Sequence, residues 1–377
     1  MKKIIVFYAS YGGGHFSAAK SIKKYLDENY DNLEVEIVDC MKYITPFFEK
    51  ITTGAYREMA KKAPGLWKKV YYHSKKGVLS GISKESNKLM SSKLLKLIKQ
   101  SNPDLIISTH PFSSQMVNYL KKKEKLDCPL ATILTDFEFH EQWIVGHMFT
   151  NFFFVSNEDM KESLVKKNVD SEKILVTGIP FSERFLEAFN KEEIFKMFDL
   201  DINKKVILFF GGGEFGLGKD KTIKMLRSLI ALNKELQIVA VAGKNEKMKL
   251  AFEEVVKEMG SEDRVRVLPF TDKVPELMNI SYLVVTKPGG LTTTESLISN
   301  LPIIVINPLP GQEEENAIFL ERHGVGVWIR KDDNPEVILS ELFNNPDKIE
   351  KMRENIKLIA KPNSTKDICD KLVSSIN

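Results

Sequence analysis

The sequence predicts an α/β protein made of two doubly wound domains. Short apolar runs rich in β-branched residues alternate with helix-like stretches, which is typical of parallel sheets covered by helices on both faces. The apolar runs form two series of six, and a chain of 377 residues exceeds the usual size of one domain. We therefore expect one parallel sheet in each half of the chain.

The two series also set the expected domain boundaries. The first series spans residues 3–9, 33–39, 104–108, 130–134, 151–155 and 173–177. The second series spans residues 205–210, 236–241, 264–268, 282–285, 302–306 and 325–329. We expect an N-terminal domain over 1–180, a linker over 181–203, a C-terminal domain over 204–360 and a final helix over 361–377.

The composition is that of a globular protein in a reducing compartment. Hydrophobic residues make up 43% of the chain and charged residues 28%, which is enough for a sizeable core. Cys40, Cys128 and Cys369 are widely spaced and odd in number, so a disulfide framework or a cysteine zinc site is not expected. The apolar run at 4–9 is too short for a signal peptide, and no run reaches the ~18 residues of a membrane span.

Positive charge is concentrated in one segment. Residues 42–99 hold fourteen Lys or Arg against three acids, a local net charge of +11 in a chain whose total is +4. Apolar residues at helical spacing and an aromatic-basic patch share this segment, a pattern that suits an anionic membrane surface. The alternative is a solvated helix whose apolar stripe faces its own core. The candidate membrane residues are Phe47, Phe48, Trp67, Lys68, Lys69 and Tyr71.

A glycine-rich turn follows the first expected strand. In open α/β sheets ligands bind where a strand ends and the next helix begins, and the residues there are GGGH at 12–15. Glycines allow close approach of a ligand, and we expect Gly13 to adopt a positive φ. The helix start disfavours protonation of His15, so a neutral imidazole is available as a general base. A tight turn with a capping histidine is the alternative.

A second glycine-rich turn follows the strand expected at 205–210. Its glycines at 211, 213 and 216 match the GxGxxG pattern of dinucleotide-binding folds. Such a site also needs an acid at the end of the next strand, but the strand at 236–241 ends in Ala-Gly-Lys. The first half has Asp39 at the equivalent place, yet Ser17 replaces its third glycine. Each half lacks one element, which disfavours a nicotinamide-dependent dehydrogenase.

Two later turns point to a nucleotide sugar. The sequence TKPGGLTTTE at 286–295 places a glycine pair at a helix start and Glu295 one turn further on, where a carboxylate can accept bonds from a sugar diol. The sequence PLPGQEEENA at 308–317 brings an amide and acids to the next helix start. The alternative is two polar first turns whose acids complement the helix dipoles.

Together these motifs resemble the diacylglycerol glycosyltransferases, which include processive diacylglycerol glucosyltransferases and monogalactosyldiacylglycerol synthases. A more distant similarity is to the peptidoglycan enzyme that adds N-acetylglucosamine to a lipid-linked muramyl peptide. The motifs in order are GGGH at 12–15, TDF at 135–137 with His140 and Trp143, VTGIP at 176–180, FGGGEFG at 210–216, KPGGLTTTE at 287–295 and PGQEEENA at 310–317. The resemblance implies a GT-B architecture, two Rossmann-like domains facing one cleft.

The resemblance also implies roles for residues at the matching positions. His15 would be the general base, and Asp136 would assist it or position the acceptor together with His140 and Trp143. Glu295 would bind the ribose, Phe270 the uracil, and Gln312 with Glu313 the hexose. The donor site would include Gly13, Gly14, Gly212, Gly213, Glu214, Gly289, Gly290, Leu291 and Thr292.

The expected reaction is an inverting transfer of glucose or galactose from a UDP-sugar to diacylglycerol, with no cofactor and no metal. The long insertion at 42–99 would approach an anionic membrane, which places the chain peripherally at the cytoplasmic face of the cell membrane. We expect no nucleic-acid partner. The residues leave open the donor hexose, the number of sugars added and the oligomeric state. A transferase to a soluble or another lipid-linked acceptor, a nucleotide-sugar epimerase and a non-catalytic UDP-sugar sensor are the alternatives.

Overall fold

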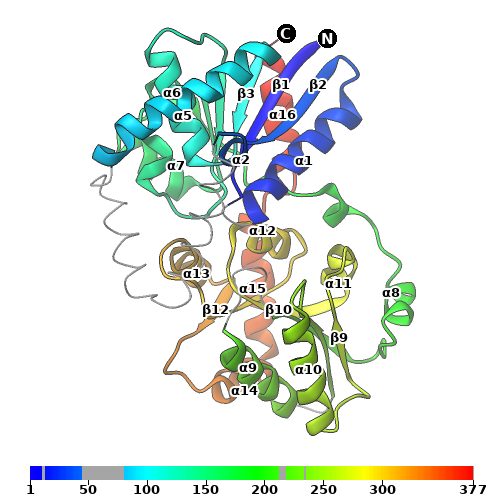
Figure 1. The fold of residues 1–377 in the computed structure, drawn as a ribbon. Helices are drawn as coiled ribbons and strands as arrows, with labels where there is room; N and C mark the ends of the chain where they lie inside the picture. The colour runs from blue at the N-terminus through cyan, green and yellow to red at the C-terminus, as the bar shows by residue number, and fades with distance from the viewer. Residues whose placement is uncertain (11–12, 45–79, 212–217, 233–234, 377) are drawn as a thin grey trace. The chain divides into compact units, whose positions relative to one another are not determined.

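A computed structural model of the chain describes most of the sequence (Figure 1). The described residues are 1–10, 13–44, 80–211, 218–232 and 235–376, with the backbone alone described for 80–89. Several expected site residues lie outside these ranges: Phe47, Phe48, Trp67, Lys68, Lys69, Tyr71, Gly212, Gly213 and Glu214.

The chain forms two compact units. The first comprises Met1–Glu183, Pro310–Gln312 and Lys361–Asn377. The second comprises Arg184–Leu309 and Glu313–Ala360. Each unit contains one parallel six-stranded sheet, as the two series of apolar runs predict.

The sheet of the first unit has the order β2-β1-β3-β4-β5-β6. Its strands are β1 (Lys2–Tyr8), β2 (Leu33–Asp39), β3 (Leu105–Ser108), β4 (Leu130–Ile133), β5 (Phe152–Val155) and β6 (Ile174–Val176). Its helices are α1 (Gly13–Asn29), α2 (Cys40–Ile44), α5 (Ser80–Ser101), α6 (Pro111–Lys122), α7 (Glu158–Val165) and α16 (Ser364–Ser374). The strand order reverses between β1 and β3, so a ligand crevice is expected at the carboxyl ends of these two strands.

Alternate side chains of β1 explain why helices cover both faces of this sheet. Ile4 and Val6 pack with residues of α1 and α16 on one face. Ile5 and Phe7 pack with residues of α2, α5 and α6 on the other. Successive side chains of a strand point to opposite faces, so a continuous apolar run such as this one requires two apolar layers.

The sheet of the second unit has the order β12-β11-β10-β7-β8-β9. Its strands are β7 (Lys205–Phe210), β8 (Leu236–Val241), β9 (Val265–Leu268), β10 (Ser281–Thr286), β11 (Ile303–Ile306) and β12 (Gly326–Ile329). Its helices are α8 (Lys191–Met197), α9 (Lys219–Leu232), α10 (Glu246–Glu258), α11 (Val274–Ile280), α12 (Gly290–Ile298), α13 (Gln312–Arg322), α14 (Pro335–Phe343) and α15 (Pro346–Ile359). This order reverses between β7 and β10, so the equivalent crevice lies where these strands end.

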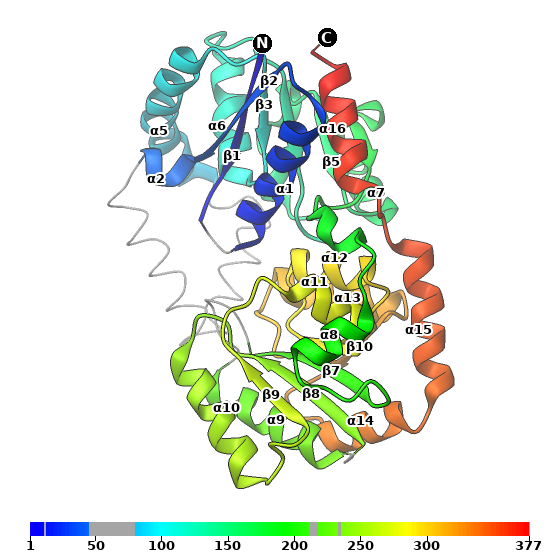
Figure 2. The same cartoon turned by 90° about the vertical axis from the view of Figure 1, so that its right-hand side faces the viewer.

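The last helix of the chain, α16, completes the first unit. Figures 1 and 2 show it beside α1, and its Asp370 accepts a hydrogen bond from the Tyr30 hydroxyl at 2.7 Å. Its start is fixed to the segment that follows β6, because Thr365 Oγ1 donates to the carbonyl of Phe181 and accepts from its backbone N–H. Ser364 Oγ donates to the carbonyl of Ile179 in the same way.

Candidate active site

His15 lies at the crevice of the first unit, in the first turn of α1. Its Nδ1 is 2.6 Å from the main-chain oxygen of Thr109, which directly follows β3, and 3.0 Å from Thr135 Oγ1, which lies beyond the end of β4. A carbonyl oxygen only accepts hydrogen bonds, so Nδ1 carries the ring hydrogen. The unprotonated nitrogen of the neutral ring is therefore Nε2.

Thr109 also fixes the backbone around His15. Its hydroxyl is 3.0 Å from the main-chain oxygen of His15 and 3.3 Å from that of Phe7. Its backbone N–H donates to the Phe7 carbonyl at 2.9 Å. Thr109 is fully buried, so these bonds are shielded from water. The end of β3 therefore holds both the ring and the main chain of His15.

The surroundings of His15 keep its ring neutral. Burial lowers the pKa of His15 to about 4, although the hydrogen bond to the Thr109 carbonyl acts in the opposite direction. The expected neutrality thus has a cause beyond the helix dipole, namely loss of solvation for the charged ring. His110 packs its ring against that of His15 with centroids 4.6 Å apart and an interplanar angle of 77°.

His110 has a fixed hydrogen-bonding role. Its Nδ1 accepts from the backbone N–H of Phe112 at 3.2 Å and so caps the start of α6. Burial, and secondarily the neighbouring His15, lower the pKa of His110 well below its usual value. The sequence motifs indicated neither Thr109 nor Thr135 as a contact of His15. The sequence shows only that each of these threonines directly follows an expected strand, at 104–108 and at 130–134.

Trp143 was expected to help position the acceptor, and its ring centre lies 6.3 Å from that of His15. Its side chain is 1% exposed and packs in a core cluster with Phe139 and Phe153. The Trp143 ring fills this core beneath the loop that follows β4. His140 is also buried, and its Nδ1 accepts from the backbone N–H of Gln142 at the start of a 3₁₀ helix (Glu141–Ile144).

Asp136 follows Thr135 at the same sheet edge. Its Oδ2 accepts from Nε2 of Gln312 at 3.0 Å, and its main-chain oxygen accepts from the hydroxyl of Ser156 at 2.9 Å. Gln312 belongs to the short segment that groups with the first unit. The proposed helper of His15 and one proposed reader of the hexose are therefore hydrogen-bonded to each other.

The prediction that Gly13 adopts a positive φ is wrong. Gly13 begins α1 without a positive φ, and a Cβ built on it meets no atom within 4 Å. Gly211, at the end of β7, differs, because a Cβ there would lie 2.6 Å from Cζ of Phe252 in α10. The glycine at 13 leaves space open, whereas the glycine at 211 permits close packing.

We predict that Gly13→Ala leaves the melting temperature equal to or slightly above that of the parent, because alanine favours helix more than glycine does. Gly211→Ala serves as the matched comparison and should lose about 1–3 kcal/mol of stability through overpacking against Phe252. Thermal and urea unfolding of both variants measure this difference. Clear destabilisation of Gly13→Ala would contradict the open surroundings of this residue.

In the second unit, the start of α12 is an uncapped helix N-terminus at the crevice. Gly289 is the N-cap residue and offers no side-chain hydrogen bond, and a Cβ built on it meets no atom within 4 Å. The first backbone N–H groups of a helix have no partner within the helix and favour anions. The amides of Gly290, Leu291 and Thr292 are in this position. The side chain of Leu291 is buried, so only its backbone is available to a ligand.

Glu295 lies one turn further along α12 and is partly buried. Burial raises its pKa to about 8. Within the described part of the chain, its carboxyl group makes no hydrogen bond to another residue. Hydroxyl donors would stabilise the ionised form of such a carboxyl group, because a ligand that supplies them removes the penalty of an unpaired buried charge.

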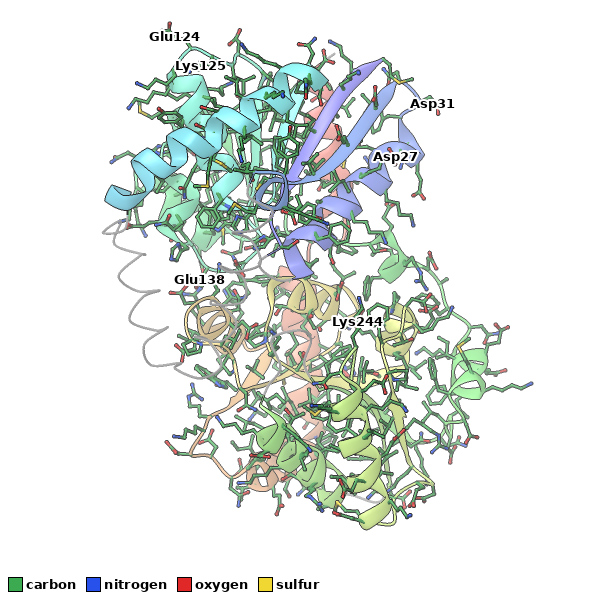
Figure 3. All side chains as sticks on the ribbon, viewed as in Figure 1. Asp27, Asp31, Glu124, Lys125, Glu138 and Lys244 are labelled. Carbon is green, nitrogen blue, oxygen red and sulfur yellow. The ribbon has the colours of Figure 1, made fainter. Side chains whose placement is uncertain are left out.

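An exposed aromatic ring stands at the same edge of the sheet. Phe270, just beyond β9, is 62% exposed. The ammonium of Lys244, a residue labelled in Figure 3 that follows β8, lies 5.2 Å from the centre of the Phe270 ring. A flat exposed ring is suited to stacking with a planar base.

Glu313 uses both carboxylate oxygens within the second unit. Its Oε1 is 2.8 Å from Nζ of Lys287, and its Oε2 accepts from the backbone N–H of Leu309 at 2.8 Å. In the first unit, Asp39 caps α2 by accepting from the N–H groups of Met41 and Lys42, so it is not a free carboxylate for a ribose. Among the described residues, no three His, Cys, Asp or Glu side chains gather around a possible metal position.

Comparison with known proteins gives the family. The chain is 31% identical over 372 residues to the processive diacylglycerol beta-glucosyltransferase of Bacillus cereus, a match covering 99% of this chain and 93% of the relative. The chain belongs to the diacylglycerol glycosyltransferase family. The enzyme of the same name from Staphylococcus epidermidis is 31% identical over 376 residues, covering 100% of this chain and 93% of the relative.

Family models agree with this membership in both halves. Residues 15–181 match the monogalactosyldiacylglycerol synthase model, and residues 206–372 match the glycosyltransferase family 28 C-terminal domain. This member of the diacylglycerol glycosyltransferase family has the GT-B fold, as solved structures show. Acinetobacter baumannii MurG has a TM-score of 0.68 against this chain, with 13% identity over 99% of this chain and all of that chain. A Staphylococcus aureus MnaA–UDP structure has a TM-score of 0.64, with 17% identity over 98% of this chain and 95% of that chain.

Within the described ranges, every helix of this family member is too short or too polar to cross a bilayer.

Proposed function

We propose that this chain transfers glucose from UDP-glucose to diacylglycerol with inversion at the anomeric carbon. The observation that carries the proposal is the His15 ring, whose Nδ1–H is fixed by the Thr109 carbonyl and whose Nε2 is therefore the basic nitrogen. The names of the curated relatives support diacylglycerol as acceptor and glucose as the sugar. Structural neighbours solved with UDP, or with UDP and glucose, support the donor class.

In the proposed reaction the acceptor hydroxyl gives its proton to Nε2 of His15. Its oxygen attacks the anomeric carbon as the bond from that carbon to the diphosphate oxygen breaks. Inversion follows from this single displacement. The Thr109 carbonyl then accepts from the Nδ1–H of an imidazolium, which is a stronger donor than the neutral ring. Asp136 would assist by positioning the acceptor.

The leaving UDP carries its new negative charge on the diphosphate. The backbone N–H groups of Gly290, Leu291 and Thr292 would stabilise this charge as it forms, together with the helix dipole of α12. Glu295 would accept bonds from the ribose hydroxyls, and Phe270 would stack on the uracil. We therefore propose that the reaction needs neither a metal nor another cofactor.

Transfer assays test this function directly. The chain is incubated with radiolabelled UDP-glucose or UDP-galactose and diacylglycerol micelles, with and without EDTA, and lipids are extracted. The proposal expects label from UDP-glucose in the lipid fraction, and equal amounts with EDTA. Label only in water-soluble products would refute the lipid acceptor, and conversion of the nucleotide sugar without transfer would indicate an epimerase. Lipid labelled only by UDP-galactose would refute the glucosyl assignment.

We further propose that the basic segment at 42–99 brings the chain to the cytoplasmic face of the cell membrane as a peripheral protein. Replacing Lys68 and Lys69, which lie outside the described residues, with Gln should weaken binding to anionic liposomes by about 2 kcal/mol at low salt, at about 1 kcal/mol per charge. Sedimentation with the liposomes measures this, and UDP affinity should not change.

Replacing Lys122 and Lys123, two exposed residues at the end of α6, with Gln is the matched control for the loss of charge. This control variant should sediment like the parent. Equal sedimentation of the Lys68 and Lys69 variant and the parent would contradict a membrane role for the aromatic-basic patch.

A further inference from the structure

The first turns of α13 are bonded to the loop that precedes α12, and all of these bonds lie within the second unit. Glu313 binds Lys287 with one oxygen and the backbone N–H of Leu309 with the other, each at 2.8 Å. One turn further along, Nδ2 of Asn316 donates to the carbonyl of Pro288 at 2.9 Å. Two helices that begin at the same sheet edge are thus linked by side chains.

These bonds are largely shielded from water. The side chains of Lys287 and Glu313 are 18% and 13% exposed, and Asn316 is fully buried. Charges attract each other more strongly in such a setting than on an open surface. Loss of one partner leaves the other charge unpaired in a partly desolvated position, which is unfavourable. The contacts therefore restrict the conformations that the loop can adopt.

The loop needs such a restraint. Gly289 and Gly290 directly follow Lys287 and Pro288, and Gly289 makes no side-chain cap that would fix the start of α12. Glycine backbones lose more conformational freedom on ordering than those of other residues. Amides that stabilise a developing charge must already be oriented before the ligand arrives.

We propose that Lys287, Glu313 and Asn316 form a brace that positions the Gly289–Gly290 turn for the diphosphate. This inference rests on the proposed function, because it assumes that the turn binds the diphosphate of UDP. The three brace residues are positioning residues. They act through the backbone amides at the start of α12.

Glu313→Gln separates the brace from two other roles, because each role predicts a different change in the affinity for UDP alone. The amide keeps the shape of the side chain but presents a donor to Lys287 or to Leu309, so the brace loosens. The expected result is roughly a tenfold increase in Kd for UDP, the scale of losing one charge-assisted bond. The same factor should apply to UDP-glucose.

A hexose reader would leave UDP affinity unchanged, because UDP has no hexose, and would lower the affinity for UDP-glucose alone. If Lys287 bound the diphosphate directly and Glu313 competed for it, the substitution would free the lysine and UDP would bind more tightly. Unchanged or tighter UDP binding by Glu313→Gln would overturn the brace.

Calorimetric titration of the full chain with UDP and UDP-glucose makes the measurement, with thermal unfolding in parallel. The matched control is Glu321→Gln, at the last turn of α13, where the carboxylate pairs with Arg330 at 2.6 Å. The control should bind UDP like the parent; a loss as large as that of Glu313→Gln would overturn the proposal. Asn316→Ala should raise the Kd for UDP in the same direction if Glu313→Gln fails to fold.

The parent separates this inference from the function on which it rests. A parent chain that does not bind UDP refutes the proposed donor. If the parent binds UDP, and Glu313→Gln binds UDP with the same affinity and has the same melting temperature, only the brace is refuted.

Discussion

His15→Ala should fold and bind UDP but lose a factor of about 10²–10⁴ in turnover, the usual contribution of a positioned general base. The ring is tied to Thr109 and Thr135 by Nδ1 alone, so the substitution leaves the surrounding main chain in place. Steady-state transfer of labelled glucose to diacylglycerol at saturating substrates measures the loss.

The control for this variant is His147→Ala, which removes an imidazole on the 3₁₀ helix His147–Phe149; this helix precedes β5 and so lies at the amino end of that strand, opposite the crevice. Its turnover should equal that of the parent. A His15→Ala enzyme with near-parental turnover would reject the base assignment, and Asp136 would then be the next residue to replace.

The pH dependence gives a second measurement of the same group. A base works only when unprotonated, so kcat/KM falls as the pH drops through the pKa of His15 in the free enzyme. Because burial lowers that pKa to about 4, the acid limb should lie well below the value near 6.5 of an exposed histidine. A limb centred near 6.5 would show that the ring is solvated in the working enzyme.

Glu295→Ala should weaken UDP binding by about 1–3 kcal/mol, the cost of leaving polar groups of the complex without partners. The carboxyl group lies one turn into α12 and makes no hydrogen bond to another described residue, so a ribose diol would be its first partner. Calorimetry with UDP measures the loss. Unchanged affinity would remove Glu295 from the donor site.

The raised pKa of Glu295 predicts that the affinity for UDP depends on pH, in a direction set by the hydroxyl groups of the ligand. Hydroxyl groups donate to the ionised carboxylate, so binding favours the charged form and releases a proton. With a pKa of about 8, UDP affinity should rise as the pH increases from 6.5 to 8.5. Glu295→Gln cannot ionise, so its UDP affinity should change less with pH. This variant therefore separates titration of Glu295 from titration of the UDP phosphate itself. A trend that persists in Glu295→Gln would exclude Glu295 as its source.

The strands were predictable because a buried parallel strand is apolar on both faces. The expected strand at 236–241 coincides with β8, and the one expected at 282–285 falls within β10 (Ser281–Thr286). The position of His15 was also predictable, because a glycine-rich turn between a strand and a helix marks the ligand-binding edge of such a sheet.

The contacts of His15 were not predictable in the same way. The group that fixes its tautomer is a main-chain carbonyl, and every residue has one. Thr109 is brought to His15 only because β3 lies next to β1, and strand order cannot be read from apolar periodicity. The burial of Trp143 could not be predicted for a related reason, since an aromatic residue in a polar loop has the same local pattern whether it packs inward or faces a lipid.

Gly13 and Glu313 show two further limits of sequence patterns. A glycine in a turn indicates either a special backbone angle or free space, and only coordinates distinguish Gly13 from Gly211. An acid at a helix start can bind a ligand, complement the dipole or pair with a lysine from another loop. For Glu313 the partner is Lys287, 26 residues earlier in the chain.

The position of α16 has a consequence for biosynthesis. Ile368, Cys369, Leu372 and Val373 fill the core of the first unit beside α1, although they follow the second unit in the sequence. Domains commonly fold in order as they emerge, from the N-terminus onward. Here the first unit exposes part of its apolar core until α16 has been synthesised, so its final folding follows the synthesis of the entire second unit. A fragment ending near residue 181, where the first family match ends, would lack this part of the core.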